Sequence, residues 1–160
     1  MPRVAPGDYP QINALSLVTA DLMRRLGINL EFVSTDWGTL VQRRASREPA
    51  ERGGWNVFHT TSSGQSLTQP VTHLFLRANG ANAWFGWPDD AEIERQRAAF
   101  VRAADAAERR RIAEALNRRS MEIMHYVPLG YYWQPSAWRR SIGNVFRAQA
   151  TVFWGITKAQ

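Results

Sequence analysis

The feature that most constrains the fold is a change of hydrophobic period between residues 12 and 32. Apolar residues first recur at spacings of three and four, which predicts one face of a helix. That face consists of Ile12, Leu15, Val18, Leu22 and Leu26. Gly27 then suits the left-handed residue that ends a helix, and Ile28, Leu30 and Phe32 alternate with polar residues, as in a strand with one buried face. The sequence therefore predicts a helix, a glycine and a strand.

Similar signals continue along the chain. Asp36 is placed to cap a helix over residues 37–47, because its carboxylate can accept a hydrogen bond from a first-turn amide. Residues 55–60 are rich in strand-forming types and open into a small polar loop at 61–66. A short helix is expected at 71–77, followed by an aromatic, amide-rich loop at 78–88.

The second half predicts a helical pair and two strands. One helix starts at Asp89 or Asp90 and runs to about Arg102, and Asp105 caps another over residues 106–124. Residues 126–133 and 151–154 are expected to be strands. Because helices and strands alternate, the predicted class is α/β, with helices against a mixed sheet. The length of 160 residues predicts a single domain over residues 1–160.

Composition excludes several classes of protein. Hydrophobic residues make up 44% and charged residues 21%, a balance typical of a folded globular protein. With no cysteine, the chain has no disulfide, thiolate nucleophile or cysteine-bound zinc. No apolar run approaches the ~20 residues of a membrane-spanning helix. The first seven residues lack the apolar core of a secretory signal, so the chain made as written is expected in the cytoplasm.

The net charge of +6 comes from 20 basic against 14 acidic residues, and Lys158 is the only lysine. Arginine suits a phosphate partner, so a small basic nucleic-acid-binding domain, rich in arginine and tryptophan, is one functional class to consider. Glutamates are interleaved with the arginines, which favours solvated helix faces and no nucleic-acid partner. Salt would separate the two, because nucleic-acid affinity falls steeply with added salt.

No catalytic pattern is present. His59, His73 and His125 are too irregularly spaced for a local metal motif, and zinc-protease, hydrolase and phosphate-loop motifs are absent. Isolated histidines of this kind are typical of structural roles. We therefore expect no enzyme, metal or cofactor.

Ligand sites in α/β folds lie at the carboxyl ends of strands, which selects the loops after residues 60 and 77. The candidate ligand-binding residues are Thr60, Thr61, Ser62, Ser63, Gln65, Asn82, Trp84 and Trp87. Hydroxyls and amides in loops also cap helices and satisfy turns, and tryptophans also pack in cores. Both interpretations stay open for these residues.

Taken in order, several segments resemble the C-terminal lobe of the extracytoplasmic solute-binding proteins of ABC importers, in the dipeptide, oligopeptide and nickel-binding family. The resemblance covers about residues 8–158, and its motifs are weak singly. The segments are Asp8-Tyr9-Pro10, residues 20–31 (ADLMRRLGINLE), Asp36-Trp37, residues 54–58 (GWNVF), the helical pair, residues 126–130 (YVPLG) and residues 152–154 (VFW).

The resemblance implies a non-catalytic fragment of a type II periplasmic-binding-protein fold. Such proteins are two-lobed, clamp a solute between the lobes and dock on ABC permease subunits in the membrane. The chain would be the last third, incomplete without the N-terminal lobe and without the strand that normally precedes Asp8. The full-length protein would be periplasmic or extracytoplasmic. Aromatic surfaces that face the absent lobe would be exposed.

One departure bears on the solute. Peptide-binding relatives place an aspartate after the strand that matches residues 55–60, where it pairs with the ligand's α-ammonium. Here no Asp or Glu occurs between Glu51 and Asp89. A desolvated ammonium without a carboxylate costs several kcal/mol. The sequence therefore favours a neutral polar or sugar-like solute over a peptide with a free amino terminus, with Trp84 and Trp87 stacking on its apolar face.

Overall fold

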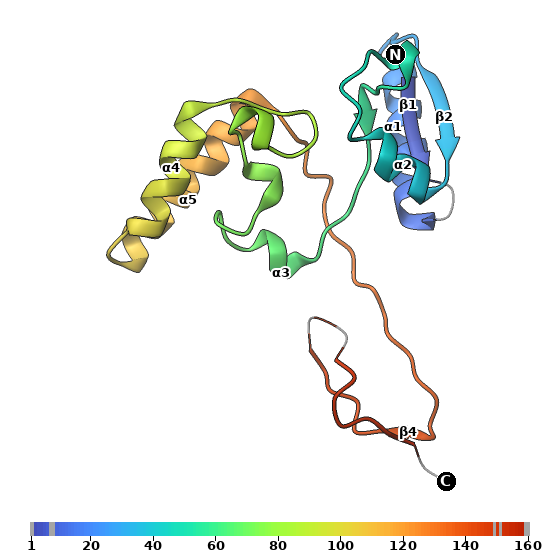
Figure 1. The fold of residues 1–160 in the computed structure, drawn as a ribbon, viewed down its shortest axis with the longest axis vertical. Helices are drawn as coiled ribbons and strands as arrows, with labels where there is room; N and C mark the ends of the chain where they lie inside the picture. Colours follow the sequence, from blue (N-terminus) through green and yellow to red (C-terminus); the bar gives the residue numbers. More distant parts are fainter. Residues whose placement is uncertain (1, 7–8, 149, 151, 159–160) are drawn as a thin grey trace. The chain divides into compact units, whose positions relative to one another are not determined.

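The computed structural model describes residues 2–6, 9–148, 150 and 152–158. It forms two compact units (Figure 1). The first comprises Met1–Ser63 and Arg77–Ala91, and the second comprises Gly64–Leu76 and Glu92–Gln160. The parallel sheet belongs to the first unit, and the longest described helix belongs to the second.

The sheet of the first unit has three parallel strands in the order β2-β1-β3. Its central strand, β1 (Pro2–Pro6), pairs with β2 (Glu31–Thr35) from Pro2 opposite Glu31 to Pro6 opposite Thr35. On its other side β1 pairs with β3 (Val57–Phe58). Helices α1 (Pro10–Arg25) and α2 (Trp37–Arg43) both contact β1. Because the strands are parallel, their carboxyl ends lie at one edge of the sheet.

The central strand β1 corrects one expectation from the sequence. A strand does precede Asp8, which itself lies outside the described residues, and it occupies residues 2–6. Proline lacks the N–H that a central strand donates, so two prolines in five residues argue against a strand. Here the prolines occupy only the first and last positions of β1, which leaves the middle of the strand able to pair on both sides.

Helix α1 ends where its glycine predicts. The Gly27 N–H donates to the carbonyl of Arg24 at 2.9 Å, and Gly27 has a φ of 77°. An L side chain rarely adopts that conformation, which explains why glycine ends the helix. The strand that follows begins at Glu31 rather than Ile28.

The buried face of α1 differs from the predicted one. Ile12, Ser16 and Ala20 are buried, whereas Val18 is 69% exposed and Leu22 is 54% exposed. Ser16 is buried without cost because its hydroxyl has hydrogen-bond partners. The small side chains of Ser16 and Ala20 let the helix approach its neighbours closely, which leaves the larger apolar stripe outside.

Helix α2 begins as predicted and ends early. The Asp36 carboxylate accepts from the Thr39 N–H at 2.9 Å and from the Thr39 hydroxyl at 2.6 Å, and these bonds lower the pKa of Asp36. The helix stops at Arg43 instead of Arg47. A 3-10 turn, η1 (Ala50–Arg52), follows, and the predicted strand at 55–60 shortens to the two residues of β3.

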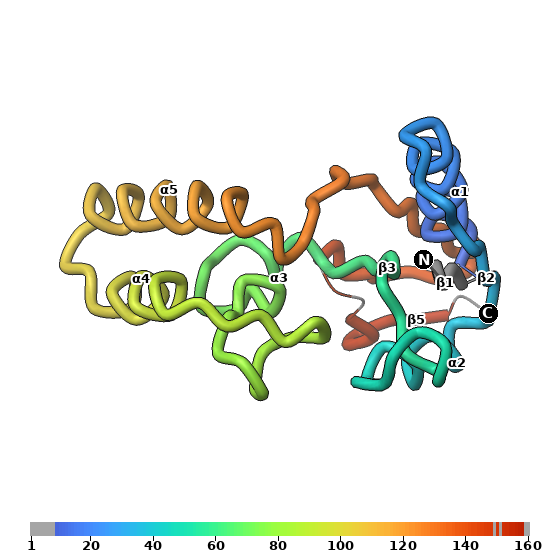
Figure 2. Tube along the Cα trace, turned by 90° about the horizontal axis from the view of Figure 1, so that it is seen from above, coloured from blue at the N-terminus to red at the C-terminus, as the bar shows by residue number. Residues whose placement is uncertain are grey.

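The second unit is built from α3 (Gly64–Leu67), the 3-10 turn η2 (Leu74–Leu76), α4 (Ala91–Arg102) and α5 (Ala106–Ile123). Asp105 caps α5 as predicted, accepting from the Glu108 N–H at 2.8 Å. The two long helices lie side by side as an antiparallel pair (Figures 1 and 2). Ile93 and Leu116 are fully buried. The helix predicted at 71–77 is only the turn η2, and residues 64–66 of the predicted polar loop belong to α3.

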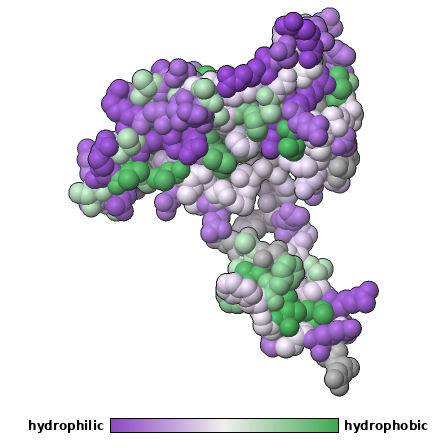
Figure 3. All heavy atoms as spheres, in the orientation of Figure 1, coloured by the Kyte–Doolittle hydropathy of each residue, from purple (hydrophilic) through white to green (hydrophobic). Residues whose placement is uncertain are grey.

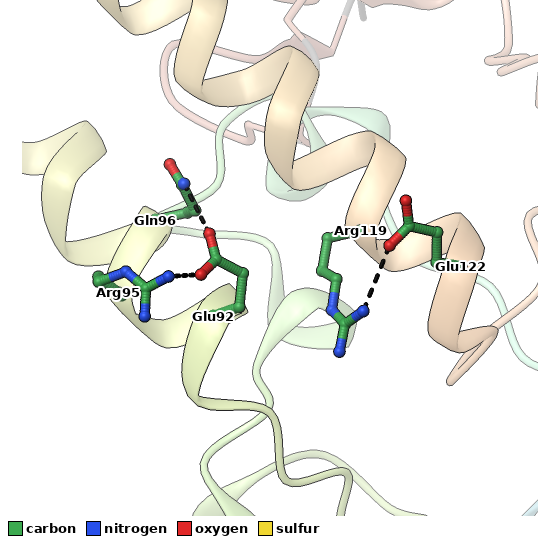
Figure 4. Close-up of polar contacts among 5 residues, drawn as sticks. All are labelled: Glu92, Arg95, Gln96, Arg119 and Glu122. Carbon is green, nitrogen blue, oxygen red and sulfur yellow. Dashed lines mark hydrogen bonds and ion pairs between the residues drawn. The ribbon is translucent and has the colours of Figure 1, made fainter.

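Helices α4 and α5 each carry ion pairs between their own side chains. Glu92 pairs with Arg95 and accepts from the Gln96 amide at 2.7 Å, and Arg119 lies 3.2 Å from Glu122 (Figure 4). Pairs of this kind, three or four residues apart, contribute little stability but keep a helix face solvated. They agree with the prediction that the interleaved charges mark helix surfaces.

The end of the chain differs most from expectation. Residues 126–133 form no strand, and neither do residues 152–154; Thr151 of that predicted strand lies outside the described residues. Instead β4 (Ile142–Gly143) and β5 (Thr157–Lys158) pair as a short antiparallel hairpin. Tyr131, Trp133 and Trp154 are between 87% and 99% exposed. Figure 3 shows hydrophobic atoms on the surface of the segment that carries β4.

The predicted α/β class is confirmed at this coarse level, because the chain combines helices with a few strands. The sheet of the first unit is wholly parallel, whereas a mixed sheet was expected. The organisation of residues 1–160 as one domain stays a prediction.

The burial pattern of α1 predicts unequal effects of two substitutions. Ile12→Ala removes a fully buried side chain and should lower the free energy of unfolding by about 2–5 kcal/mol. Leu22→Ala, its control on the same helix, should change it by less than about 0.5 kcal/mol. Denaturant unfolding followed by circular dichroism measures both. Equal losses would contradict the described orientation of α1.

Candidate functional site

Four of the predicted site residues follow the carboxyl end of β3. We refer to them as the hydroxyl loop: Thr60, Thr61, Ser62 and Ser63. Thr60 is half-buried and the other three are exposed. Their position at the carboxyl edge of a parallel sheet is where ligands bind in open α/β folds. This placement agrees with the expectation from the sequence.

A buried histidine positions the start of this loop. His59 is 7% exposed, and its Nδ1 lies 3.0 Å from Ser16 Oγ while its Nε2 lies 3.0 Å from Thr19 Oγ1. Both hydroxyls also donate to carbonyls of their own helix, those of Ile12 and Leu15, at 2.9 Å. The ring thus joins the end of β3 to α1. We refer to His59, Ser16 and Thr19 as the histidine clasp.

Sequence reasoning gave His59 a structural role, and the clasp confirms it. The partners of the ring were not predicted, because Ser16 and Thr19 lie outside the apolar stripe of Ile12, Leu15, Val18, Leu22 and Leu26. A signal was present: the two hydroxyls are three residues apart, so they share one helix face, and that face also holds Ile12 and Ala20.

The remaining predicted residues fall into separate places. Gln65 is exposed on α3, in the second unit. Asn82 ends the 3-10 turn η3 (Gly80–Asn82) in the first unit and is exposed. The loop that contains Asn82 is closed by backbone bonds from Gly80 N–H to Pro88 and from Asp90 N–H to Ala78, each 2.9 Å. These bonds hold together the two ends of the segment that contains Trp84 and Trp87.

Trp84 and Trp87 pack against arginines that follow α2. The guanidinium carbon of Arg44 lies 5.2 Å from the Trp84 ring centre and that of Arg47 lies 4.4 Å from the Trp87 ring centre. Arg44 also lies 4.8 Å from Phe85 and 5.6 Å from Trp37. We name this group the arginine–aromatic cluster, and it comprises Trp37, Arg44, Arg47, Trp55, Trp84, Phe85 and Trp87.

Trp55 ties the cluster to the sheet. Its indole N–H donates to the Arg44 carbonyl at 2.9 Å, and its ring centre lies 4.6 Å from Phe58 and 6.4 Å from Trp87. Trp55 precedes β3, whereas the hydroxyl loop follows β3. The two groups of predicted site residues therefore attach to opposite ends of that strand.

Arg44 is a half-buried cation held by rings instead of a carboxylate. Burial lowers its pKa, and its Nε is buried without a hydrogen-bond partner among the described residues. The attraction of a cation to several ring faces compensates part of the lost hydration. Because Arg44 and Arg47 each sit over an indole, both tryptophans already have a packing partner, which the sequence pattern did not reveal.

The described side chains give little support to metal binding or to membrane spanning. Among the residues that the structure describes, no three His, Asp or Glu side chains are grouped to hold a metal ion. Across the same residues, every helix is too short or too polar to cross a membrane. The glutamates of α4 and α5 shown in Figure 4 pair with neighbouring arginine and glutamine side chains.

Comparison with known proteins gives one informative match, and no protein-family model matches the chain. The chain is 32% identical over 152 residues to a probable peptide ABC transporter periplasmic-binding protein from Sinorhizobium fredii. The match covers 95% of this chain but only 29% of the relative's length. The relative is named as a binding component of a transporter rather than an enzyme, which agrees with the predicted non-catalytic class.

The resemblance drawn from the sequence is therefore confirmed: the chain is homologous to part of a peptide ABC transporter periplasmic-binding protein.

Proposed function

We propose that the chain is the C-terminal lobe of a solute-binding protein that captures a solute for an ABC importer. The observation that carries the proposal is the 32% identity across nearly the whole chain to a periplasmic-binding protein of a peptide ABC transporter. In this proposal the complete protein is extracytoplasmic, and a second lobe and the permease subunits are its partners.

Exposed aromatic residues support a second lobe. Tyr131 and Trp133 are almost fully exposed, and Phe153 and Trp154 are at least 75% exposed. Clusters of exposed aromatic side chains are typical of surfaces that another body covers. The relative is more than three times as long as the matched segment, so the rest of such a protein is large enough to supply that body.

The hydroxyl loop is the proposed solute contact of this lobe. It follows a parallel strand, and its side chains can donate and accept hydrogen bonds. The histidine clasp fixes His59, the residue directly before the loop. Asn82 adds an exposed amide in the same unit, and contact of the solute with Gln65, which belongs to the second unit, stays a prediction. For Trp84 and Trp87, stacking on a solute stays a prediction, since a guanidinium already lies over each ring.

The proposed solute is neutral and polar or sugar-like, or a peptide whose amino terminus is not held by this lobe. No Asp or Glu occurs between Glu51 and Asp89, so the hydroxyl loop contains no carboxylate of its own for an α-ammonium. Hydroxyls and amides satisfy a neutral partner without leaving a buried charge unpaired.

Calorimetry on the full-length protein that contains this segment tests the solute class. Ala-Ala and N-acetyl-Ala-Ala should bind with dissociation constants within about threefold of each other, because no carboxylate of this lobe engages the amino group. Micromolar affinity for Ala-Ala that disappears on acetylation would contradict the proposal. Thr61→Val should weaken capture of whichever probe binds, whereas Thr72→Val, a hydroxyl outside the loop, should not.

The exposed aromatic segment predicts association of the isolated chain. Sedimentation of residues 1–160 should depend on concentration, because the aromatic surface is unprotected. A Trp133→Ser, Trp154→Ser double variant should sediment closer to a monomer, and Val101→Ser, an exposed apolar position on α4 outside the aromatic segment, should not change the behaviour. A chain that stays monomeric at about 100 μM would indicate that these rings are covered.

A further inference from the structure

A cavity of about 200 Å³ lies in the second unit, and none of its lining residues belongs to the hydroxyl loop. Its wall comes from the segment that follows α3 and from α5, which run near each other (Figure 2). The ten residues that line it are Leu67, Thr68, Gln69, Pro70, His73, Leu76, Ala113, Leu116, Asn117 and Tyr126. We name it the α5 cavity.

The α5 cavity combines an apolar floor with a polar rim. Pro70, Leu76 and Leu116 are buried, whereas Gln69 and Asn117 are exposed. Apolar walls with a few converging polar groups are typical of small-molecule sites. A volume of about 200 Å³ is below the roughly 300–1,000 Å³ of typical ligand pockets, so the cavity suits only a small molecule.

The polar side chains at the cavity are available for a ligand. The amides of Gln69 and Asn117 are exposed, and the Nδ1 of His73 is buried without a hydrogen-bond partner among the described residues. A buried ring nitrogen of this kind costs free energy unless it gains a bond. The His73 ring itself is held by packing, with its centre 5.5 Å from Tyr126 and 5.8 Å from Phe75.

The charge of the cavity restricts the ligand. None of its ten lining residues is Asp, Glu, Lys or Arg. Burial lowers the pKa of His73 more than interaction with its own backbone raises it, and repulsion from His125 and Arg97 lowers it further, so the ring is neutral near pH 7. Arg97 is itself engaged, 2.8 Å from Glu94 and bonded to the Pro70 carbonyl. An ion that entered would lose hydration without meeting an opposite charge.

We propose that the α5 cavity is a second binding site, for a small uncharged molecule that pairs an apolar face with amide or hydroxyl groups. The molecule packs on Leu76 and Leu116 and bonds His73, Gln69 and Asn117. This site is independent of solute capture by the hydroxyl loop, whose residues belong to the other unit.

Three probes of nearly equal size test the proposal on the whole chain: propionamide, propionate and propylammonium. Chemical shifts of backbone amides, followed by nitrogen-15 NMR, report binding residue by residue. Propionamide should give saturable shifts at residues 69, 73, 117 and 126 with a millimolar dissociation constant, as suits so small a ligand. The two ions should bind at least tenfold more weakly.

Variants separate the cavity from unspecific effects. His73→Phe keeps an aromatic ring but removes both nitrogens, and it should weaken propionamide binding about tenfold. Asn117→Leu, at an exposed position of α5, provides the same test if His73→Phe does not fold. Gln96→Leu is the control, because that amide bonds Glu92 on α4, and it should bind as the parent chain does.

Three results would overturn the assignment. They are the lack of saturable shifts with propionamide, binding of propionate or propylammonium with equal affinity, and unchanged affinity in both cavity variants. Shifts centred on residues 60–63 would likewise place the probe at the hydroxyl loop and not in the α5 cavity. Failure of solute capture in the calorimetry leaves these outcomes unaffected, because the two sites share no residue.

Discussion

The histidine clasp determines where the proposed solute contact of this lobe begins. Strand β3 has only two residues, too few to fix the chain that follows by strand pairing alone. His59 supplies the missing constraint by placing its two ring nitrogens 3.0 Å from hydroxyls of α1. A buried polar ring with a hydroxyl beside each nitrogen favours one arrangement, since moving the ring away would leave its nitrogens without partners. The hydroxyl loop starts at the next residue, so the clasp fixes where the loop begins.

At the other end of β3, arginines and aromatic rings replace both ion pairs and apolar packing. The guanidinium of Arg44 lies over three rings and that of Arg47 over a fourth. Cation–π contacts within the fold therefore stabilise these two positive charges. On α4 and α5, Arg97, Arg110 and Arg119 instead pair with glutamates three or four residues away. That the chain has no nucleic-acid partner stays a prediction.

Features that depend on neighbouring residues, such as helix caps, could be predicted from the sequence. Contacts between residues far apart in the chain could not. Asp36 and Asp105 cap the helices expected of them, because a cap depends on residues three apart in the chain. The buried face of α1 was predicted wrongly. Periodicity shows that the helix has an apolar face, but it does not show that the contact between Ser16 and His59 buries a different one. Strand β1 was not predicted, and the prolines at its two ends argue against a strand. For the candidate site, the hydroxyl loop was placed correctly after a strand, whereas the arginines over Trp84 and Trp87 come from some 40 residues away in sequence.

The account as a whole depends on solute reaching the hydroxyl loop of a complete, two-lobed protein. Hydrogen exchange measured by mass spectrometry on the full-length protein, with and without a pool of dipeptides, tripeptides and disaccharides, addresses this directly. Amides of residues 60–63 should become protected when a solute binds, because closure of a second lobe removes them from water. Protection confined to other parts of the protein, with residues 60–63 exchanging as fast as before, would contradict the account.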